Sequence, residues 1–337
     1  MRSSRVRVGG AIADVRDRVV TATTSLFSHG DPPLEHTLDY LGDPGLLGPD
    51  SVSWRVIGDA TAFVGGIRAL LVQTAHPEVV AGVEDHSAYR HDPLGRLTRT
   101  SYYVTQTTYG AMPEVEAAVQ IVRRAHAPVR GQSERGRAYS AGTPELAAWV
   151  HNVLTESFLV AYQHYGPEEL STEDADRFVA EQTRIGALLG AAPLPETAAD
   201  LTDWIEGQDL ASTDAQRHAI EFLTSPPLSL PVKIGYSMLY QAAAATLTGH
   251  MSELIGVRAG PGAARLGGAA TCSLRWALGS SPSWHLALVR AQADVPAGLF
   301  RQPLPPEARA LVSRVASSAT TSRRGEDALV SQRSGKV

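Results

Sequence analysis

Two histidines of this sequence fall on the apolar faces of predicted helices, where an imidazole can ligate a metal. The first, His126, ends the apolar stripe of a predicted helix over residues 113–126. The other members of that stripe, with its continuation, are Val115, Val119, Val122 and Val129. We therefore expect His126 on the core-facing side, where a neutral imidazole in an apolar pocket can be a metal ligand. A core histidine whose nitrogens bind backbone or water fits the same spacing and is the commoner case.

The second histidine, His151, has the same kind of position in the next predicted helix, residues 144–165. It shares a face with Ala147, Leu154 and Phe158, which are about one or two helical turns away. The ligand interpretation and the structural interpretation again both apply. We take His126 as the first candidate ligand and His151 as the second.

A cation, a hydroxyl and a phenol share one face of the predicted helix over residues 96–109. Arg96, Thr100 and Tyr103 stand at positions i, i+4 and i+7, so their side chains should converge. Such a set can bind the carboxylates of a cofactor or stabilise a reduced oxygen species, because a guanidinium pairs well with planar carboxylates. A solvated helix start with local hydrogen bonds explains the same pattern.

The remaining histidines and the single cysteine give weaker signals. His76, His86 and His91 fall in predicted loops, where we expect ordinary surface residues, and His164 lies at the end of its helix, where it serves the helix dipole. Cys272 alone excludes an internal disulfide, a CxxC metal site and a covalently attached c-type haem. It also lacks the glycine-flanked loop expected of a haem thiolate ligand. Phosphate-loop, HExxH, GxSxG and paired Glu-x-x-His motifs are absent from the sequence.

Composition excludes several other classes of protein. The chain has 337 residues, 43% of them hydrophobic, and a formal net charge of −5. Acidic and basic residues are well mixed, so a nucleic-acid partner is not expected. No uninterrupted apolar stretch is long enough for a transmembrane segment, and the N-terminus lacks the apolar run of a secretory signal. We expect a cytoplasmic protein.

Helical periodicity dominates the sequence, and strand signals are almost absent. The fold class predicted is therefore all-α, a multi-helix single domain. We expect an N-terminal extension over residues 1–50, a helical domain over 51–316 and a disordered tail over 317–337. The predicted helices cover residues 54–74, from Pro77, 96–109, 113–126, 144–165, 172–189, 196–206, 213–223, 232–254, 270–278 and 283–293.

Several short segments, in order, resemble the family that groups the bacterial latex-clearing rubber oxygenases with the fungal oxygenase MpaB. The likeness covers roughly residues 54–256. Its carriers are the segments 74–77, 81–83, 86–87, 92–100, 122–131, 139–141 and 148–151. This resemblance implies a globin-like helical core around a non-covalent b-type haem, with iron as the metal and His126 as its proximal ligand.

The resemblance also implies roles for the residues near the predicted helix start at 96. The Arg-x-x-x-Thr pair beside the haem matches Arg96 and Thr100, and a family lysine is replaced by Arg99. Dioxygen would bind opposite His126, with Arg99 or Arg96 near it. The family's catalytic glutamate has no clear match, although Glu84 lies nearby.

The reaction implied is oxidative cleavage of a carbon–carbon double bond in an isoprenoid-like or other lipophilic substrate. Two other functions remain open at this stage. One is a helical haem carrier or sensor without turnover, and the other is a haem-free helical scaffold whose histidines are structural.

Overall fold

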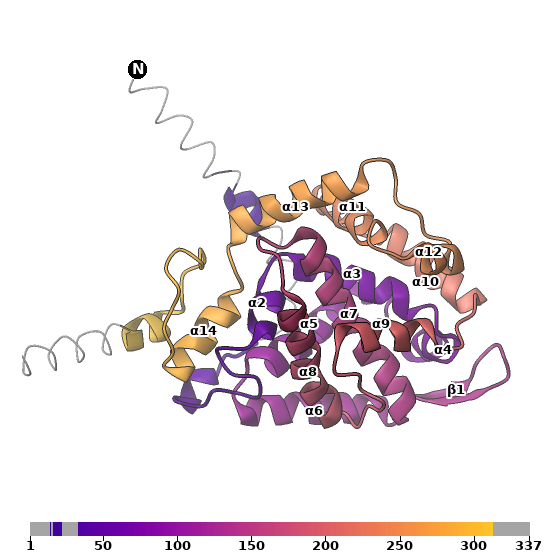
Figure 1. The fold of residues 1–337 in the computed structure, drawn as a ribbon, viewed down its shortest axis with the longest axis horizontal. Coiled ribbons are helices and arrows are strands. Elements are labelled where there is room, and N and C mark those ends of the chain that lie inside the picture. Colours follow the sequence, from indigo (N-terminus) through magenta and orange to yellow (C-terminus); the bar gives the residue numbers. More distant parts are fainter. Residues whose placement is uncertain (1–13, 15, 22–32, 313–337) are drawn as a thin grey trace, which may run out of the picture.

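The computed structural model describes residues 14, 16–21 and 33–312, and this part of the chain is mostly helical, with one small β-hairpin (Figure 1). Its elements are η1 Thr37–Tyr40, α2 Val52–Gly58, α3 Thr61–Gln73, α4 Pro77–His86, α5 Pro93–Tyr109, α6 Met112–His126, β1 Arg130–Gln132, β2 Ala138–Ser140, α7 Pro144–Tyr165, α8 Thr172–Leu188, α9 Ala198–Glu206, α10 Asp214–Thr224, α11 Leu230–Ala244, α12 Gly249–Ile255, α13 Ala263–Leu278 and α14 Pro282–Ala291. The prediction of a multi-helix fold is confirmed. The globin-like haem core stays a prediction, and the predicted tail over 317–337 lies outside the described residues.

The first predicted core helix, over 54–74, is wrong as a single helix. The chain breaks at Asp59, whose backbone is extended, and α2 and α3 meet there at a bend of 88°. The Asp59 carboxylate accepts a hydrogen bond from the Thr61 backbone N–H at 2.9 Å and receives Arg275 Nε at 2.6 Å. An aspartate that satisfies the first N–H groups of a new helix stabilises a break, and the apolar periodicity across it conceals that break.

The predicted helix over 232–254 is likewise two helices. α11 ends at Ala244, and Thr248 caps α12 by accepting a hydrogen bond from the Met251 backbone N–H at 3.2 Å. The threonine cap is a local signal of a new helix, but the long apolar run led to the prediction of a single continuous helix.

The β-hairpin was not predicted. β1 and β2 are antiparallel, with Gly131 opposite Tyr139, and Gly136 takes a φ of +74° in the connecting turn. Each strand has only three residues, too few for alternation of apolar and polar residues to be recognised. The hairpin follows α6 directly and projects from one end of the molecule (Figure 1).

Helices α3 and α7 pack against each other in the centre of the fold (Figure 1). Gly65 allows this, because a Cβ there would lie 2.7 Å from the Phe158 ring. One buried ion pair joins the two helices: Arg68 Nη1 lies 2.5 Å from Glu156 Oε2. The largest fully buried aromatic side chains of the described residues are Trp54, Trp149, Tyr109, Tyr162 and Phe178. This core fixes the positions of α5 and α6, which carry the candidate residues.

Candidate functional site

Helix α5 begins three residues before its predicted start and carries Arg96 in its first turns. Asp92 caps the helix by accepting a hydrogen bond from the Gly95 backbone N–H at 2.9 Å, and Pro93 occupies the first turn. Proline and an aspartate cap are both favourable at a helix N-terminus. The cap therefore sets the rotation of α5 and the direction in which Arg96, Thr100 and Tyr103 project.

The Arg96 guanidinium is half-buried and, among the described residues, has no hydrogen bond or ion pair to a carboxylate. It stands over the Tyr89 ring, 5.9 Å from the ring centroid. Burial lowers the pKa of Arg96 from its usual value, since a low-dielectric environment disfavours the charged form. Arg96 is thus a partly desolvated cation that has no counter-ion within the described part of the chain.

Tyr103 adds an unsatisfied hydroxyl to the same face of α5. Its Oη atom is buried without a hydrogen-bond partner, and burial raises the pKa of the phenol. The Thr98 hydroxyl of the same helix is also buried and without a partner. Buried donors without partners are uncommon in folded proteins and call for an explanation. The face of α5 therefore offers the N–H groups of Arg96 and the hydroxyl of Tyr103 to a ligand.

Thr100, the third predicted residue of this face, and Arg99, which the resemblance singled out, have partners within α5 and its cap. Thr100 Oγ1 donates to the Arg96 backbone carbonyl at 3.1 Å, and the residue is exposed. Arg99 is exposed and pairs with Asp92 at 3.2 Å. Arg96 and Tyr103 are partly buried, whereas Thr100 and Arg99 are exposed, and the convergence of Arg96, Thr100 and Tyr103 stays a prediction.

His126 ends α6 but is exposed, so the expectation that it faces the core is wrong. The buried stripe of α6 covers only its first half, with Val115 and Val119, and Ile121 is already 57% exposed. The surrounding protein nevertheless lowers the pKa of His126 through burial. Its ring has no hydrogen bond to any described residue. His126 therefore has a lowered pKa and a ring without a hydrogen-bond partner among the described residues, and no hydrogen bond or ion pair joins it to α5.

His151, in contrast, is buried between α7 and α8. A Cβ at Gly186 would come within 2.7 Å of the His151 ring, so the glycine is what makes room for it. Burial lowers the pKa of His151 to about 4, and a hydrogen bond to the Gln182 backbone partly opposes the shift. This histidine is enclosed by its own fold, as the structural interpretation expects.

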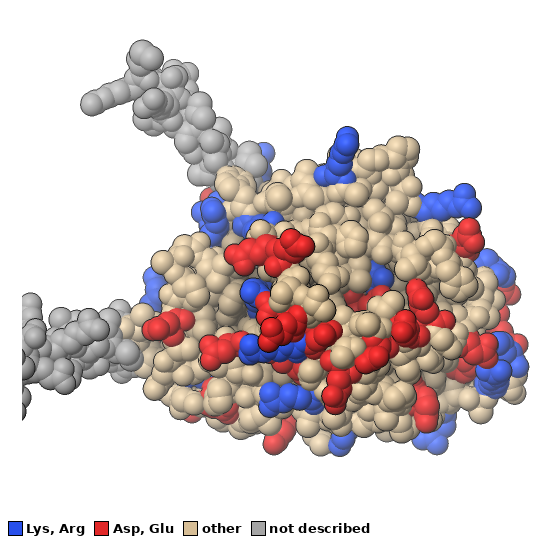
Figure 2. All heavy atoms as spheres, in the orientation of Figure 1, with Lys and Arg blue, Asp and Glu red and all other residues tan. Residues whose placement is uncertain are grey.

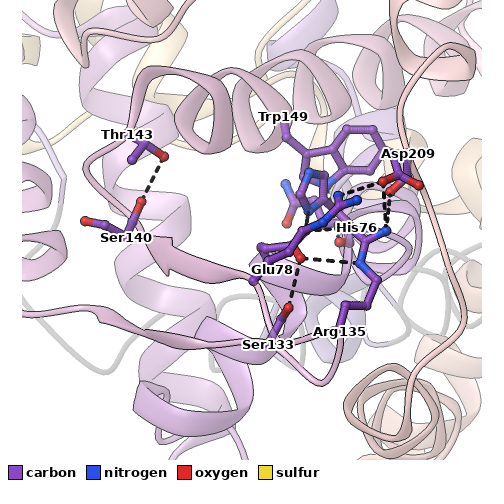
Figure 3. Close-up of polar contacts among 10 residues, drawn as sticks. His76, Glu78, Ser133, Arg135, Ser140, Thr143, Trp149 and Asp209 are labelled. Atoms are coloured by element: carbon purple, nitrogen blue, oxygen red, sulfur yellow. Dashed lines mark hydrogen bonds and ion pairs between the residues drawn. The ribbon is translucent and has the colours of Figure 1, made fainter.

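His76 is not the ordinary surface residue that its loop position predicted. Its side chain is 14% exposed and lies 3.4 Å from Glu78, beside the Trp149 ring (Figure 3). Glu78 Oε2 also receives Arg135 Nη2 at 2.7 Å, and Arg135 pairs with Asp209 at 3.1 Å. We call these four residues, His76, Glu78, Arg135 and Asp209, the Glu78 cluster.

The Glu78 cluster fixes the β-hairpin that follows His126. Ser133, next to β1, donates to Glu78 Oε1 at 2.9 Å (Figure 3). On the other strand, Tyr139 Oη donates to Asp85 at 2.5 Å. Both carboxylates belong to α4, so α4 holds the hairpin and, through it, the end of α6. Sequence reasoning missed this set, because its members are separated along the chain and only Glu78 lies in a predicted helix.

Glu84, the only glutamate considered as a base, is occupied. Its carboxylate accepts from Tyr89 Oη at 2.8 Å and from Arg90 Nη2 at 2.6 Å, and it lies 3.3 Å from His218. Tyr89 thus links Glu84 to Arg96. The Tyr89 ring lies under the guanidinium groups of Arg90 and Arg96. This contact was not predicted from the sequence, although the Tyr-Arg pair before Asp92 could have indicated it.

The remaining sequence candidates lie apart from this region. His86 Nε2 contacts the Arg130 carbonyl at 3.1 Å, and His164 Nδ1 contacts the Val160 carbonyl at 2.9 Å in the last turns of α7. His91 and Cys272 are exposed. Within the described residues no group of three or more histidine, cysteine or acidic side chains could hold a metal ion.

Together, the helical fold and the half-buried cation and phenol of α5 describe a helical protein prepared to bind an anionic or polar ligand group. Residues 54–279 match the family model described as ER-bound oxygenase mpaB/B'/rubber oxygenase, catalytic domain. The chain therefore belongs to this family of oxygenases, and the sequence resemblance is confirmed. No curated protein and no solved structure matched the chain.

In the described part of the chain, no single helix is long and apolar enough to cross a bilayer. The pair α2 and α3 passes that test only when its two members, bent by 88°, are taken together.

Proposed function

We propose that this protein is an oxygenase that uses a non-covalent b-type haem to cleave a carbon–carbon double bond in a lipophilic, isoprenoid-like substrate with dioxygen. Membership of an oxygenase family supports the reaction class. The observation that carries the haem assignment is His126, whose ring has a lowered pKa and no hydrogen bond to a described residue. A neutral imidazole with a free nitrogen is the form that ligates haem iron.

The other groups fit the chemistry of a haem. Its propionates are planar carboxylates, and Arg96 is a half-buried guanidinium that lacks a carboxylate partner. Tyr103 supplies a buried hydroxyl without a partner. His151 fits less well as the ligand, because its ring is enclosed by Gly186 and hydrogen-bonded to backbone. We assign the iron-ligand role to His126 and the carboxylate-binding role to Arg96.

When bound, the haem supplies the dioxygen-activating chemistry that no side chain provides. The protein's own contribution is to bind, orient and exclude water. Arg96 would supply positive charge to the carboxylates of the haem, and the Tyr103 hydroxyl could donate a hydrogen bond, because burial raises its pKa and keeps it protonated. Arg99 can add a second charge if it leaves Asp92, with which it forms an exposed pair.

Oxygen uptake and product analysis test the reaction. We expect the reduced, haem-loaded protein to consume oxygen with a polyisoprenoid and to give carbonyl products, and His126→Ala to abolish both. Autoxidation without carbonyl products would identify a haem carrier or sensor instead. A protein that stays colourless after haem is added would instead support the interpretation of a haem-free scaffold.

A further inference from the structure

Helices α11 and α13 carry several large apolar side chains that are exposed to solvent. The exposed fractions are 72% for Leu230 and 58% for Ile234 on α11, and 53% for Leu266 and 39% for Trp276 on α13. We call the outer surface of these two neighbouring helices the α11–α13 face. Single exposed apolar residues need no explanation, but a group of them on adjacent helices indicates an interaction surface.

The packing of α13 explains why its apolar residues point outward. Its inner side is made of small residues that are buried, and Gly267 lies directly against Ala242 of α11. The outer side bears Arg265, Leu266, Ala269, Ser273 and Trp276. Small residues make the contact with α11, and Leu266 and Trp276 are left exposed in the described part of the chain.

The charge of this part of the chain is one-sided. Glu253 is the only carboxylate between Glu221 and Asp294. Lys233, Arg258 and Arg265 are exposed in the same stretch, and none of them forms an ion pair with a described residue. In Figure 2 the edge formed by α13 is mostly uncharged with isolated basic side chains, whereas acidic side chains gather across the middle and lower parts of the view.

The two other cations of this stretch are directed into the fold. Arg275 Nε lies 2.6 Å from Asp59 Oδ2, and the fully buried Arg290 donates to the Tyr109 carbonyl at 2.5 Å. They serve the structure and contribute little charge to the surface. The cations available to a partner are therefore Lys233, Arg258 and Arg265.

We propose that the α11–α13 face binds the surface of an anionic lipid membrane. Exposed leucine, isoleucine and tryptophan side chains with lysine and arginine beside them, on two helices that themselves contain no carboxylate, match the composition of interfacial helices. A second copy of this chain is a poorer occupant, because a symmetric contact would bring like charges together without carboxylates to pair with them. The inference does not depend on haem binding, and it would deliver the protein to a phase in which lipophilic molecules dissolve.

Vesicle sedimentation with the full-length protein tests the proposal. Vesicles of phosphatidylcholine are compared with vesicles of equal parts phosphatidylcholine and phosphatidylglycerol, at low and high salt. We expect binding to the anionic vesicles that weakens with salt. Each cation near an anionic surface contributes about fivefold to binding, so combined Lys233→Glu, Arg258→Glu and Arg265→Glu should reduce binding about a hundredfold or more.

Matched variants separate the face from general surface properties. Leu266→Ser with Trp276→Ser should reduce vesicle binding at least tenfold, because both side chains enter the interface. Ile121→Ser on α6 is the apolar control, since Ile121 is 57% exposed, and Arg184→Glu on α8 is the charge control. Both controls should bind as the unmodified protein does.

Fluorescence of the unmodified protein detects the bound face directly, and one conservative variant assigns the signal. Trp54 and Trp149 are fully buried and Trp276 is exposed, so brominated lipids should quench part of the emission, and Trp276→Phe should remove that part. Equal binding to neutral and anionic vesicles, or binding unaffected by the α11–α13 variants, would overturn the proposal. Sedimentation of the protein as a dimer that Leu266→Ser dissociates would assign the face to a second copy.

Discussion

The Glu78 cluster and the face of α5 that carries Arg96 and Tyr103 differ in how far their polar side chains are paired within the fold. In the cluster, Glu78 receives Ser133 and two nitrogens of Arg135, and Arg135 continues to Asp209. On α5, the Arg96 guanidinium has no carboxylate partner among the described residues, and the Tyr103 hydroxyl is buried without one. Both regions are polar and partly enclosed, but the Glu78 carboxylate has its partners within the fold, although His76 Nδ1 is buried without a hydrogen bond.

The difference indicates where the fold serves stability and where it serves a ligand. A buried polar group without a partner costs free energy, while a partnered one is close to neutral or favourable. The chain therefore loses stability at Arg96 and Tyr103, and a ligand that supplied the missing acceptors would recover it. The Glu78 carboxylate already has its donors, and its role is to hold the hairpin that follows His126.

Removal of Glu78 should have the largest effect on stability. Glu78→Ala leaves Arg135 and Ser133 without their acceptor in a nearly buried site, and breaking such a pair costs about 3 kcal/mol or more. Urea denaturation measures the loss. Arg137→Gln is the control, because Arg137 pairs with Asp209 while 60% exposed, and its loss should cost at most about 1 kcal/mol. Equal effects of the two changes would contradict the anchoring role of the cluster.

The two candidate histidines should differ in how stability depends on pH. The folded-state pKa of His151 is about 4, against 6.5 for the free side chain. Between these values the unfolded chain binds more protons, so the free energy of unfolding should fall as the pH is lowered from 6.5 to about 4. The total for this group is about 3 kcal/mol. Above pH 6.5 its contribution is fully present.

Stability curves of His151→Leu and the unmodified protein, recorded across that pH window, test the assignment. The variant should lose this part of the slope, and His164→Gln, at an exposed ring on the same helix, should keep it. A slope unchanged in His151→Leu would mean that the ring is open to solvent, and the distinction between His151 and His126 would fail.

Two tyrosines of α5 offer the smallest and most selective comparison. Tyr109 Oη donates to the Trp54 carbonyl at 2.9 Å, whereas Tyr103 Oη has no partner. Tyr109→Phe should destabilise the protein by about 1 kcal/mol, and Tyr103→Phe should leave its stability unchanged or raise it by a similar amount. Thermal unfolding of ligand-free protein distinguishes them. A destabilised Tyr103→Phe would show that the hydroxyl already serves the fold.

Much of the fold could be predicted from the sequence, because apolar periodicity and caps are local. Helix α7 begins at Pro144 and ends at Tyr165 as predicted. The breaks at Asp59 and before Thr248 were missed, since an apolar run crosses each of them. The hairpin depends on Glu78 and Arg135, which meet only through tertiary packing, so no local pattern could reveal it.

The candidate site was predictable in its residues but not in their surroundings. The spacing of Arg96 and Tyr103 on one face is a local property of a helix. Whether a side chain on that face has a partner is not, as the pairing of Arg99 with Asp92 shows. His126 and His151 have similar sequence patterns, and only the packing of α8 through Gly186 separates the enclosed ring from the accessible one.

Haem titration, followed by the Soret absorption of the full-length protein, tests the central claim most directly. The unmodified protein should bind one haem, His126→Ala should lose the band characteristic of histidine ligation, and Arg96→Gln should bind more weakly by about tenfold or more, as expected for the loss of a charge-assisted contact. His151→Leu should retain the spectrum. A Soret band that survives in His126→Ala but disappears in His151→Leu would contradict the account and place the iron at the enclosed histidine.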